Sequence, residues 1–360
     1  MKIVADENIR LLKHFFLKQA AVITKPGREI VRADLVDADV LLVRTVTRVD
    51  KHLLHDTSVR FVGSTTVGED HLDTEWLKSQ GIAWSIAKGC NTTAVVEYVI
   101  CVIAALQKQG LLNSSGLRAG VIGVGEIGSR VVKILRALGF TVIMHDPLRA
   151  AEQNFISTPL EQFADLDLIS LHVPLTEKTV FPTYHLMDEK FLRRQKKKTV
   201  MINTSRGAVL DTNAWLNAGK HLIGCFDVWE NEPNISADML ASAHLATPHI
   251  AGYSVQSKLR GMELIYQALL RANILSLKPF VEIDYPRQNL LLDKTATDWR
   301  DLVLAVFDPR ELSAQMKADP LFDGRRGQFD SRYEFRFINW ENKELAYTQM
   351  LNWYLQLGLE

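Results

Sequence analysis

The sequence contains few cysteines, no long apolar segment and no excess of either charge. Its three cysteines, Cys90, Cys101 and Cys225, are too few and too scattered for a disulfide framework or a metal cluster. The most apolar helix-like stretch, residues 94–106, is too short to span a bilayer. Lysine plus arginine and aspartate plus glutamate both number 42, so we expect no nucleic-acid or membrane partner. Because MKIVADENIR lacks the pattern of a signal peptide, we expect a cytoplasmic protein. We expect no bound metal.

A chain of 360 residues, 47% of them hydrophobic, is expected to form two or three domains. We expect a substrate-binding domain made of residues 1–93 and 255–284, and a dinucleotide-binding domain over residues 94–254. The remaining residues, 285–360, are predicted to form a small α+β module. The basic run at residues 193–198 contains no interleaved aromatic residue, so it is interpreted as a solvated helix end.

Residues 118–147, RAGVIGVGEIGSRVVKILRALGFTVIMHDP, contain a strand, a glycine turn, a helix, a second strand and an acid. Gly123 permits a tight turn, Gly125 lets a pyrophosphate approach the backbone, and Gly128 lets the helix pack on the strand. Asp146 is placed to accept hydrogen bonds from ribose hydroxyls and to repel a 2′-phosphate. The segment therefore predicts a Rossmann unit that binds NAD rather than NADP.

Short apolar runs alternate with helical patterns on both sides of this unit, which predicts two doubly wound parallel sheets of the Rossmann or flavodoxin type. The expected strands are residues 3–5, 40–43, 61–62, 82–83, 166–173, 199–203, 222–227 and 244–247. The expected helices are residues 9–20, 71–80, 93–109, 213–218 and 254–275. In the C-terminal module, Asp308 and Pro309 predict a helix start, and alternating aromatic residues at 333–337 predict a half-buried strand.

Ligands bind beyond the carboxyl ends of parallel strands, where several polar segments of this chain are expected. In the first domain these segments are Arg44-Thr45 and the loop at residues 63–68, which offers backbone amides and hydroxyls to an anion. In the second domain they are residues 203–207, 227–233 and 247–253.

The second-domain segments contain an arginine, two glutamates and a histidine that suit hydride transfer from a 2-hydroxy acid. His249 is the candidate base for the hydroxyl proton, and Arg206 is the candidate for the substrate carboxylate. A carboxylate beside the imidazole would stabilise its charged form. Spacing does not distinguish Glu230 from Glu232 for this role.

Taken in order, the glycine turn with Asp146, SRG, DVWENEP and TPHIAG resemble the D-isomer-specific 2-hydroxyacid dehydrogenases over residues 1–284. The resemblance implies that Arg206 binds substrate, Glu232 partners the histidine and His249 is the acid/base. It also implies NAD contacts at Asp227, at Gly252 and at the backbone of Val173. With the residues of the glycine turn included, the full set of expected cofactor contacts is Gly123, Gly125, Glu126, Ile127, Gly128, Asp146, Val173, Asp227 and Gly252.

Three further features resemble one branch of that family, which oxidises a phosphorylated 2-hydroxy acid in pyridoxal phosphate biosynthesis. They are the opening KIVADENI, the sequence HIAGYS and the C-terminal module. This resemblance implies substrate contacts at Thr45, Thr66 and Tyr253, and a homodimer formed through the module. Arg206 with the 64–68 loop, and Arg44 with Thr45, are expected to hold the two anionic ends of the substrate. The alternatives are a dehydrogenase for phosphoglycerate, glycerate or hydroxypyruvate, and a non-enzymatic NAD-sensing corepressor.

Overall fold

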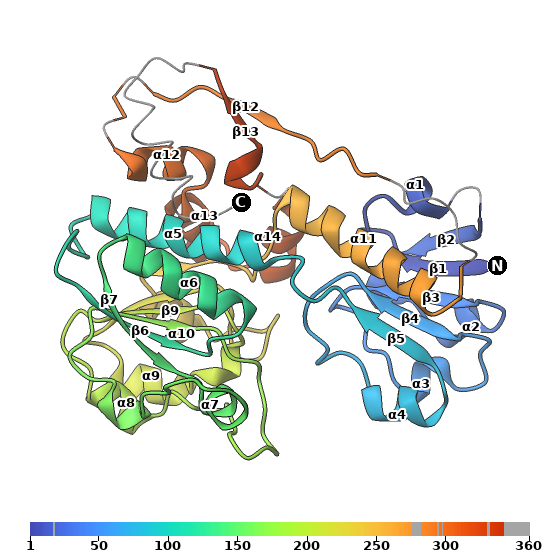
Figure 1. The fold of residues 1–360 in the computed structure, drawn as a ribbon, viewed down its shortest axis with the longest axis horizontal. Helices are drawn as coiled ribbons and strands as arrows, with labels where there is room; N and C mark the ends of the chain where they lie inside the picture. The colour runs from blue at the N-terminus through green and yellow to red at the C-terminus, as the bar shows by residue number, and fades with distance from the viewer. Residues whose placement is uncertain (17–18, 276–281, 294, 297, 330–331, 342–360) are drawn as a thin grey trace. The chain divides into compact units, whose positions relative to one another are not determined.

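The computed structural model describes residues 1–16, 19–275, 282–293, 295–296, 298–329 and 332–341. The chain divides into two compact units, the first formed by Met1–Asn91 with Tyr253–Pro286 and the second by Thr92–Gly252 with Arg287–Glu360 (Figure 1). Each unit contains a parallel sheet with helices packed on it, as predicted. Within the described residues, no helix combines the length and apolar character needed to cross a membrane.

The sheet of the first unit has five parallel strands in the order β2-β1-β3-β4-β5. Its central strands are buried along almost their whole length, which explains why they appear in the sequence as continuous apolar runs. The strands are β1 (Lys2–Asp6), β2 (Ala21–Lys25), β3 (Val40–Val43), β4 (Phe61–Ser64) and β5 (Ala83–Ile86). The helices are α1 (Leu12–Phe16), α2 (Arg32–Leu35), α3 (Lys51–Leu54), α4 (Thr74–Ser79) and α11 (Val255–Arg271).

Several elements of the first unit differ from the sequence prediction: the short helices α2 and α3 were not predicted, and β5 begins and ends later than expected. Strand β2 was not predicted, because it lies at the edge of the sheet and none of its side chains is fully buried. The helix expected over residues 9–20 is the short α1, and residues 17–18 lie outside the described residues. The apolar run of the edge strand, residues 20–23, follows directly on the helical pattern of residues 9–20 and was not recognised as a separate strand.

Helix α11 returns the chain to the first unit and packs closely on β4. A Cβ atom added at Gly63 would lie 2.6 Å from Ile265 of α11, and one at Gly261 would lie 2.5 Å from the carbonyl oxygen of Thr65. Only glycine permits these approaches. The close packing fixes the loop that follows β4, which contains Thr65 and Thr66.

The sheet of the second unit has six parallel strands in the order β11-β10-β9-β8-β6-β7. The chain reverses direction across the sheet between β6 and β8, so the carboxyl ends of these neighbours form the topological switch point where dinucleotides bind. The strands are β6 (Arg118–Ile122), β7 (Thr141–His145), β8 (Leu168–Leu171), β9 (Val200–Asn203), β10 (Ile223–Phe226) and β11 (Leu245–Ala246).

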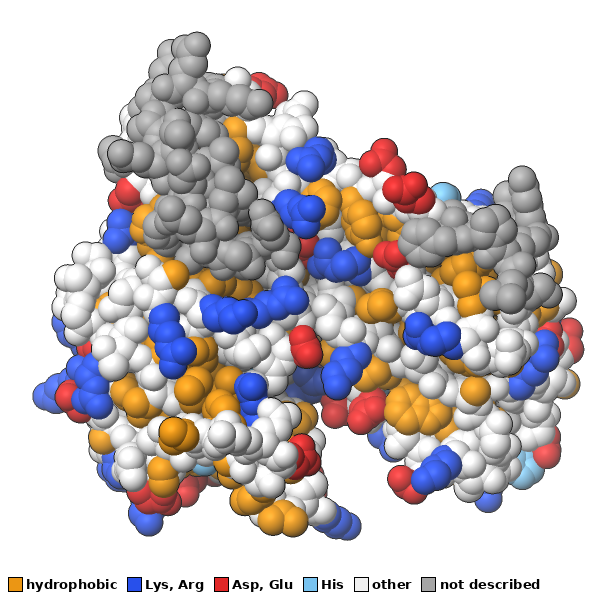
Figure 2. Space-filling view, viewed as in Figure 1, with side chains coloured by type: hydrophobic (Ala, Val, Ile, Leu, Met, Phe, Trp, Pro, Cys, Tyr) orange, Lys and Arg blue, Asp and Glu red, His pale blue; other side chains and the backbone are white. Residues whose placement is uncertain are grey.

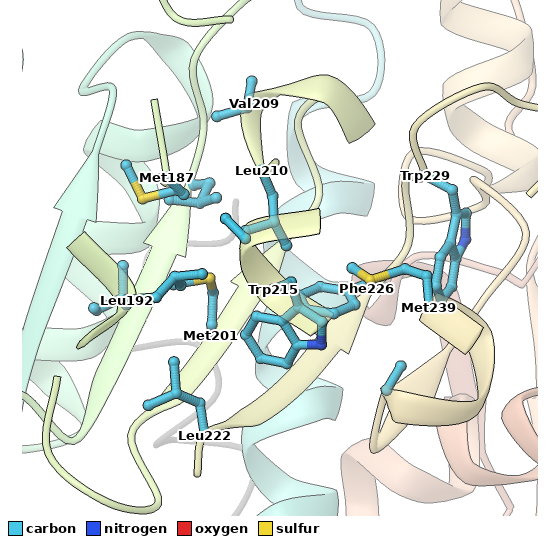
Figure 3. Close-up of a cluster of buried hydrophobic side chains, with 14 of the residues drawn as sticks. Met187, Leu192, Met201, Val209, Leu210, Trp215, Leu222, Phe226, Trp229 and Met239 are labelled. Carbon is cyan, nitrogen blue, oxygen red and sulfur yellow. The ribbon is translucent and has the colours of Figure 1, made fainter. Parts of the chain in front are cut away.

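Helices α5 (Thr92–Lys108) and α6 (Glu126–Ala137) lie side by side in this unit, and so do α8 (Glu189–Arg193) and α9 (Thr212–Ala218) (Figure 1). A cluster of buried side chains packs α8 and α9 on the sheet (Figure 3). Trp215 meets the ring of Phe226 edge-on at 4.8 Å, and Phe226 in turn meets Trp229. This core therefore extends to the loop that follows β10.

The C-terminal segment groups with the second unit. It contains β12 (Gln288–Leu290), α12 (Trp299–Val306), α13 (Pro309–Ala318), α14 (Phe322–Gln328) and β13 (Ile338–Trp340), and β12 pairs with β13 in parallel. Asp308 caps α13 by accepting from the Arg310 amide, and Pro309 begins the helix, as predicted.

The prediction of a strand at residues 333–337 is wrong. Phe335–Phe337 is a 3₁₀ turn, and the strand begins at Ile338. Arg332 and Glu334 are buried, whereas Arg336 is exposed. The Arg332 guanidinium donates to the carbonyls of Ala94 and Ala251, and the Phe335 amide donates to Glu97. The burial therefore does not follow the regular alternation expected from the sequence.

Charged side chains of both signs are interspersed on the face seen in Figure 2. The basic run at 193–198 follows this pattern, since Arg193 pairs with Glu189, and Lys196 pairs with Asp165 and Asp167. These ion pairs agree with the interpretation of the run as a solvated helix end.

Candidate active site

The glycine turn after β6 has the backbone geometry that the sequence predicts for a phosphate-binding turn. Gly123 has φ +84°, and a Cβ atom there would lie 2.5 Å from the carbonyl oxygen of His172. A Cβ atom at Gly128 would lie 1.9 Å from the Gly123 carbonyl oxygen, whereas one at Gly125 would meet nothing within 4 Å. The turn is thus tightly packed on its inner side and open at Gly125, where a pyrophosphate would meet the first turn of α6 with Glu126 and Ile127.

Asp146 follows β7 and has a structural role in addition to the predicted one. Its Oδ2 atom accepts from the Val124 amide at 2.8 Å, and Oδ1 accepts from the Arg149 amide at 2.9 Å. The second bond caps α7 (Pro147–Glu152). Each carboxylate oxygen can accept a further bond, so these contacts leave capacity for ribose hydroxyls.

His172 and Val173 follow β8, across the switch point from the glycine turn. Burial lowers the pKa of His172 to about 3, so its ring is neutral at physiological pH. The ring nitrogens lie 2.8 Å from Ser170 Oγ and 3.4 Å from Thr204 Oγ1. The side chain of Val173 packs on the core, which leaves its backbone as the part available to a cofactor.

Arg206, Glu232 and His249 follow three adjacent strands, β9, β10 and β11. Backbone hydrogen bonds join the segments that carry them: the Asp227 amide donates to Asn203, and the His249 amide donates to Asp227 at 2.7 Å. The three predicted catalytic residues therefore belong to one hydrogen-bonded edge of the sheet.

His249 pairs with Glu232 rather than with Glu230. Its Nδ1 atom lies 2.7 Å from Glu232 Oε2, while Glu232 Oε1 accepts from the Trp229 amide at 2.8 Å. Burial raises the pKa of Glu232, but the contacts with His249 and the Trp229 amide outweigh it and hold the pKa below its ordinary value. A charged Glu232 stabilises a proton on His249.

The carboxylate of Asp227 is buried and holds the loop that contains His249. It accepts from Thr247 Oγ1 at 2.6 Å and from the amides of Ile250 and Ala251, each at 2.8 Å. Gly252 follows directly. Any contact between Asp227 and a cofactor is thus additional to a fully internal role in loop structure.

The backbone of Arg206 is fixed by Asn203, whose side-chain Nδ2 donates to the Arg206 carbonyl at 3.0 Å. The side-chain oxygen of Asn203 accepts from the amide and hydroxyl of Ser205. Next to Arg206, a Cβ atom at Gly207 would lie 1.9 Å from the carbonyl carbon of Trp229. The Arg206 turn therefore packs directly against the loop that carries Glu232.

The substrate contacts predicted in the first unit lie at the ends of β3 and β4. Arg44 Nε donates to the buried Asp6 at 2.9 Å, which fixes the guanidinium and balances its charge, and half-buried Thr45 follows it. Thr66 Oγ1 lies 2.8 Å from Ser64 Oγ, which lies 3.0 Å from His71 Nε2.

Tyr253 begins the return to the first unit, and the Lys258 ammonium lies 5.0 Å from the centre of its ring.

Sequence reasoning missed Asp6, Asn203 and His185, the partner of Glu230. Asp6 and Asn203 are polar residues at the ends of buried strands, a signal that could have identified them. His185 lies in a loop, and nothing in its sequence context indicates its partner. Among the described residues, no group of three His, Cys, Asp or Glu side chains could hold a metal ion.

Comparisons with known proteins identify the family of this chain. Residues 104–251 match the model of the D-isomer specific 2-hydroxyacid dehydrogenase, NAD binding domain. An erythronate-4-phosphate dehydrogenase of Coxiella burnetii is 43% identical over 346 residues, which is 94% of each chain. One from Hahella chejuensis is 41% identical over 93% of this chain and 91% of its own.

Solved structures share the fold. A 3-phosphoglycerate dehydrogenase of Entamoeba histolytica with bound NAD+ superposes with a TM-score of 0.64 at 22% identity, covering 78% of this chain and 99% of its own. A D-lactate dehydrogenase of Aquifex aeolicus gives 0.63 at 23% identity, covering 76% and 95%. With the extent and identity of the sequence matches, the chain belongs to the erythronate-4-phosphate dehydrogenase family, within the NAD-dependent D-isomer-specific 2-hydroxyacid dehydrogenases.

Proposed function

We propose that the protein oxidises 4-phospho-D-erythronate to the corresponding 2-oxo acid with NAD, as a step of pyridoxal 5′-phosphate biosynthesis. The observation that carries the proposal is the His249–Glu232 pair at 2.7 Å in a chain whose relatives are named erythronate-4-phosphate dehydrogenase. The pair can accept and hold the proton that a dehydrogenase removes from its substrate. The names of the relatives indicate which substrate this is.

His249 acts as the base in the oxidation direction. Its Nδ1 atom faces Glu232, so Nε2 is the nitrogen that accepts the proton of the substrate hydroxyl. Glu232 stabilises the imidazolium that forms, and Arg206 binds the substrate carboxylate and polarises the developing carbonyl. Bound NAD supplies the acceptor for the hydride.

The cofactor contacts proposed for this reaction are those predicted from the sequence. The open position at Gly125 and the amides at the start of α6 support a pyrophosphate site, and the spare acceptor capacity of Asp146 supports a ribose site. The proposed contacts are Gly123, Gly125, Glu126, Ile127, Gly128, Asp146, the Val173 backbone, Asp227 and Gly252.

The first unit is proposed to bind the substrate through Arg44, Thr45, Thr66 and Tyr253. Asp6 holds Arg44 by Nε, the atom furthest from the guanidinium tip, which supports a role for the tip nitrogens in binding an anion. The hydroxyl chain from Ser64 to Thr66 supports an oriented donor at the end of β4.

We also propose three domains, residues 1–93 with 255–284, 94–254 and 285–360, and a homodimer formed through the last of them. The matches extend over 94% of the chain and therefore include most of this segment. The proposed compartment is the cytoplasm, which agrees with the three buried free cysteines. Light scattering at micromolar concentration tests the dimer; a monomer would contradict it.

Substrate selectivity tests the proposed function. We expect kcat/KM for 4-phosphoerythronate to exceed that for 3-phosphoglycerate by at least about 100-fold, because buried groups placed for one acid remain unpaired with another. Glycerate, oxidised with NAD, and hydroxypyruvate, reduced with NADH, both lack the phosphate and serve as further comparisons. Equal or greater activity on 3-phosphoglycerate or on the glycerate/hydroxypyruvate pair would assign the protein to another 2-hydroxy acid. NADH-dependent partner binding without turnover would indicate a corepressor.

A further inference from the structure

A second histidine–glutamate pair joins the loop that carries Glu232 to the loop before α8, and the proposed reaction does not use it. His185 Nε2 lies 2.9 Å from Glu230 Oε1, and both side chains are partly buried. Burial raises the pKa of Glu230, but its contacts with His185 and Thr212 outweigh it and hold the pKa below its ordinary value. Glu230 is therefore charged at neutral pH and able to hold its donors.

The backbone around His185 lies against the turn that follows Arg206. The His185 amide donates to the carbonyl of Ala208 at 2.8 Å, and the Met187 amide donates to Val209 at 3.0 Å. Met187 also forms a bridge with Leu210. His185 itself has φ +51° and its ring stacks on Tyr184 at 3.9 Å. These contacts fix the position of the ring relative to the Arg206 turn.

Glu230 connects the ring to a second fixed point. Its Oε2 atom accepts from the Thr212 amide at 3.3 Å, at the start of α9. Asp211 caps that helix, and its Oδ2 atom lies 3.5 Å from His185 Nδ1. The imidazole is thus held between two carboxylates, one on α9 and one on the Glu232 loop.

The same two loops are also in contact in the core. Gly207 packs against the peptide between Trp229 and Glu230, and Trp229 belongs to the buried cluster that contains Val209 and Met187 (Figure 3). The core contact fixes the Trp229 end of the loop. Glu230 lies between Trp229 and Glu232 in this loop. The side-chain bonds of Glu230 therefore fix the path of the backbone from Trp229 to Glu232.

We propose that His185 is a positioning residue: through Glu230 it ties the Glu232 loop to the Arg206 turn and so keeps Glu232 facing His249. The catalytic consequence rests on the proposed function, because it assumes that these three residues act on one substrate. Without the tie, the loop keeps its contacts at Trp229 and the bonds of Glu232 to the Trp229 amide and to His249, but Glu230 is no longer fixed. Glu232 is then held less firmly beside His249.

The tie is tested first without substrate, by amide hydrogen exchange on His185→Ala, Glu230→Ala and the double variant. We expect faster exchange in peptides covering residues 227–235 and 206–213 in all three. His221→Ala and Glu189→Ala are matched controls, because His221 bonds to the carbonyl of Gln195 and Glu189 pairs with Arg193. Wild-type exchange rates in both peptides of the His185 and Glu230 variants would overturn the tie.

Turnover then tests the positioning role. We expect His185→Ala and Glu230→Ala each to lower kcat by up to ~100-fold, the loss that a misplacement of about 1 Å in a catalytic group produces, with NADH affinity unchanged. The acidic limb of the pH profile of kcat/KM should shift in both variants. The kcat of the double variant should be no lower than that of either single variant, and His185→Gln should have a higher kcat than His185→Ala. Additive losses, or an unchanged kcat and pH profile, would overturn the proposal.

The two proposals fail in distinguishable ways. If the wild-type protein does not oxidise 4-phosphoerythronate, the proposed substrate is wrong, and the same variants are compared on whichever 2-hydroxy acid is oxidised. The exchange measurement needs no substrate and decides the tie in either case.

Discussion

The two glutamates of the DVWENEP segment show how similar residues separate into different roles. Glu232 lies 17 residues before His249 in the chain and bonds to it, whereas Glu230 bonds to His185. Spacing from the sequence could not separate them, because the choice depends on how the loop turns at Asn231, which has φ +62°. The residue types and their place after three strands were predictable; the pairing required the loop geometry.

Replacing the proposed base tests the chemistry at the residue scale. His249→Gln keeps a polar side chain of similar size but cannot accept the hydroxyl proton, so we expect kcat to fall by ~10²–10⁴-fold. NADH affinity, measured by fluorescence titration, should be unchanged. His221→Gln is the control in the same unit, and wild-type turnover by His249→Gln would contradict the assignment.

Gly207→Ala tests the contact between the Arg206 turn and the loop that carries Glu232. The added Cβ atom would lie 1.9–2.3 Å from the Trp229–Glu230 backbone, which cannot move like a flexible side chain. We expect ~1–3 kcal/mol of lost stability and a reduced kcat, measured by thermal unfolding and initial rates. Gly327→Ala places a Cβ atom in open space on a helix and should be neutral or stabilising. If both variants behaved alike, the loop contact would be unimportant.

At the scale of elements, burial decided which predictions succeeded. Strands buried on both faces, such as β3 and β9, have continuous apolar sequences and were predicted within a residue. The edge strand β2 has no fully buried side chain, and its apolar run merges with the helical pattern before it, so it was missed. Residues 333–337 misled because Arg332 and Glu334 are buried, with the Arg332 guanidinium bonded to backbone carbonyls. Where polar groups are paired inside the fold, alternation of residue types no longer reports which side faces water.

Asp146 has two roles that one substitution tests together. Its carboxylate caps α7 and is also the proposed acceptor for the ribose hydroxyls of the cofactor. Asp146→Ala should therefore cost ~0.5–2 kcal/mol of stability through the lost cap and reduce the preference for NADH over NADPH, measured as the ratio of their Kd values. Asp188→Ala removes the cap of α8, where Asp188 accepts from the Phe191 amide, and should affect stability alone. An unchanged Kd ratio in Asp146→Ala would contradict the ribose role.

At the scale of the whole molecule, half-buried histidines make stability depend on pH. Burial lowers the pKa of His172 to about 3, and burial also lowers that of His244. The unfolded chain binds protons at these sites near pH 6.5 while the folded chain does not, so stability present above pH 6.5 is lost as pH falls. Glu232, whose folded pKa is lowered, adds its own loss only below its unfolded value near 4.5.

The window between pH 6.5 and 5.5 therefore isolates the histidines. We expect His172 to contribute a loss of ~1 kcal/mol across it, and His172→Asn to unfold with a smaller pH dependence in thermal scans. His52→Gln, at an exposed position, should keep the wild-type dependence. A His172→Asn protein with an unchanged dependence on pH would show that the ring is accessible to protons in the folded state.

The central claim is that this site removes a hydride from C2 of 4-phosphoerythronate. It is tested most directly by a single turnover of the protein with NAD and substrate deuterated at C2, followed by near-ultraviolet absorbance and mass spectrometry of the reduced cofactor. The account predicts an absorbance rise in wild type, deuterium on the nicotinamide ring, and neither in His249→Gln on the same time scale. Reduced cofactor without deuterium, or no reduction of NAD by wild type, would contradict it.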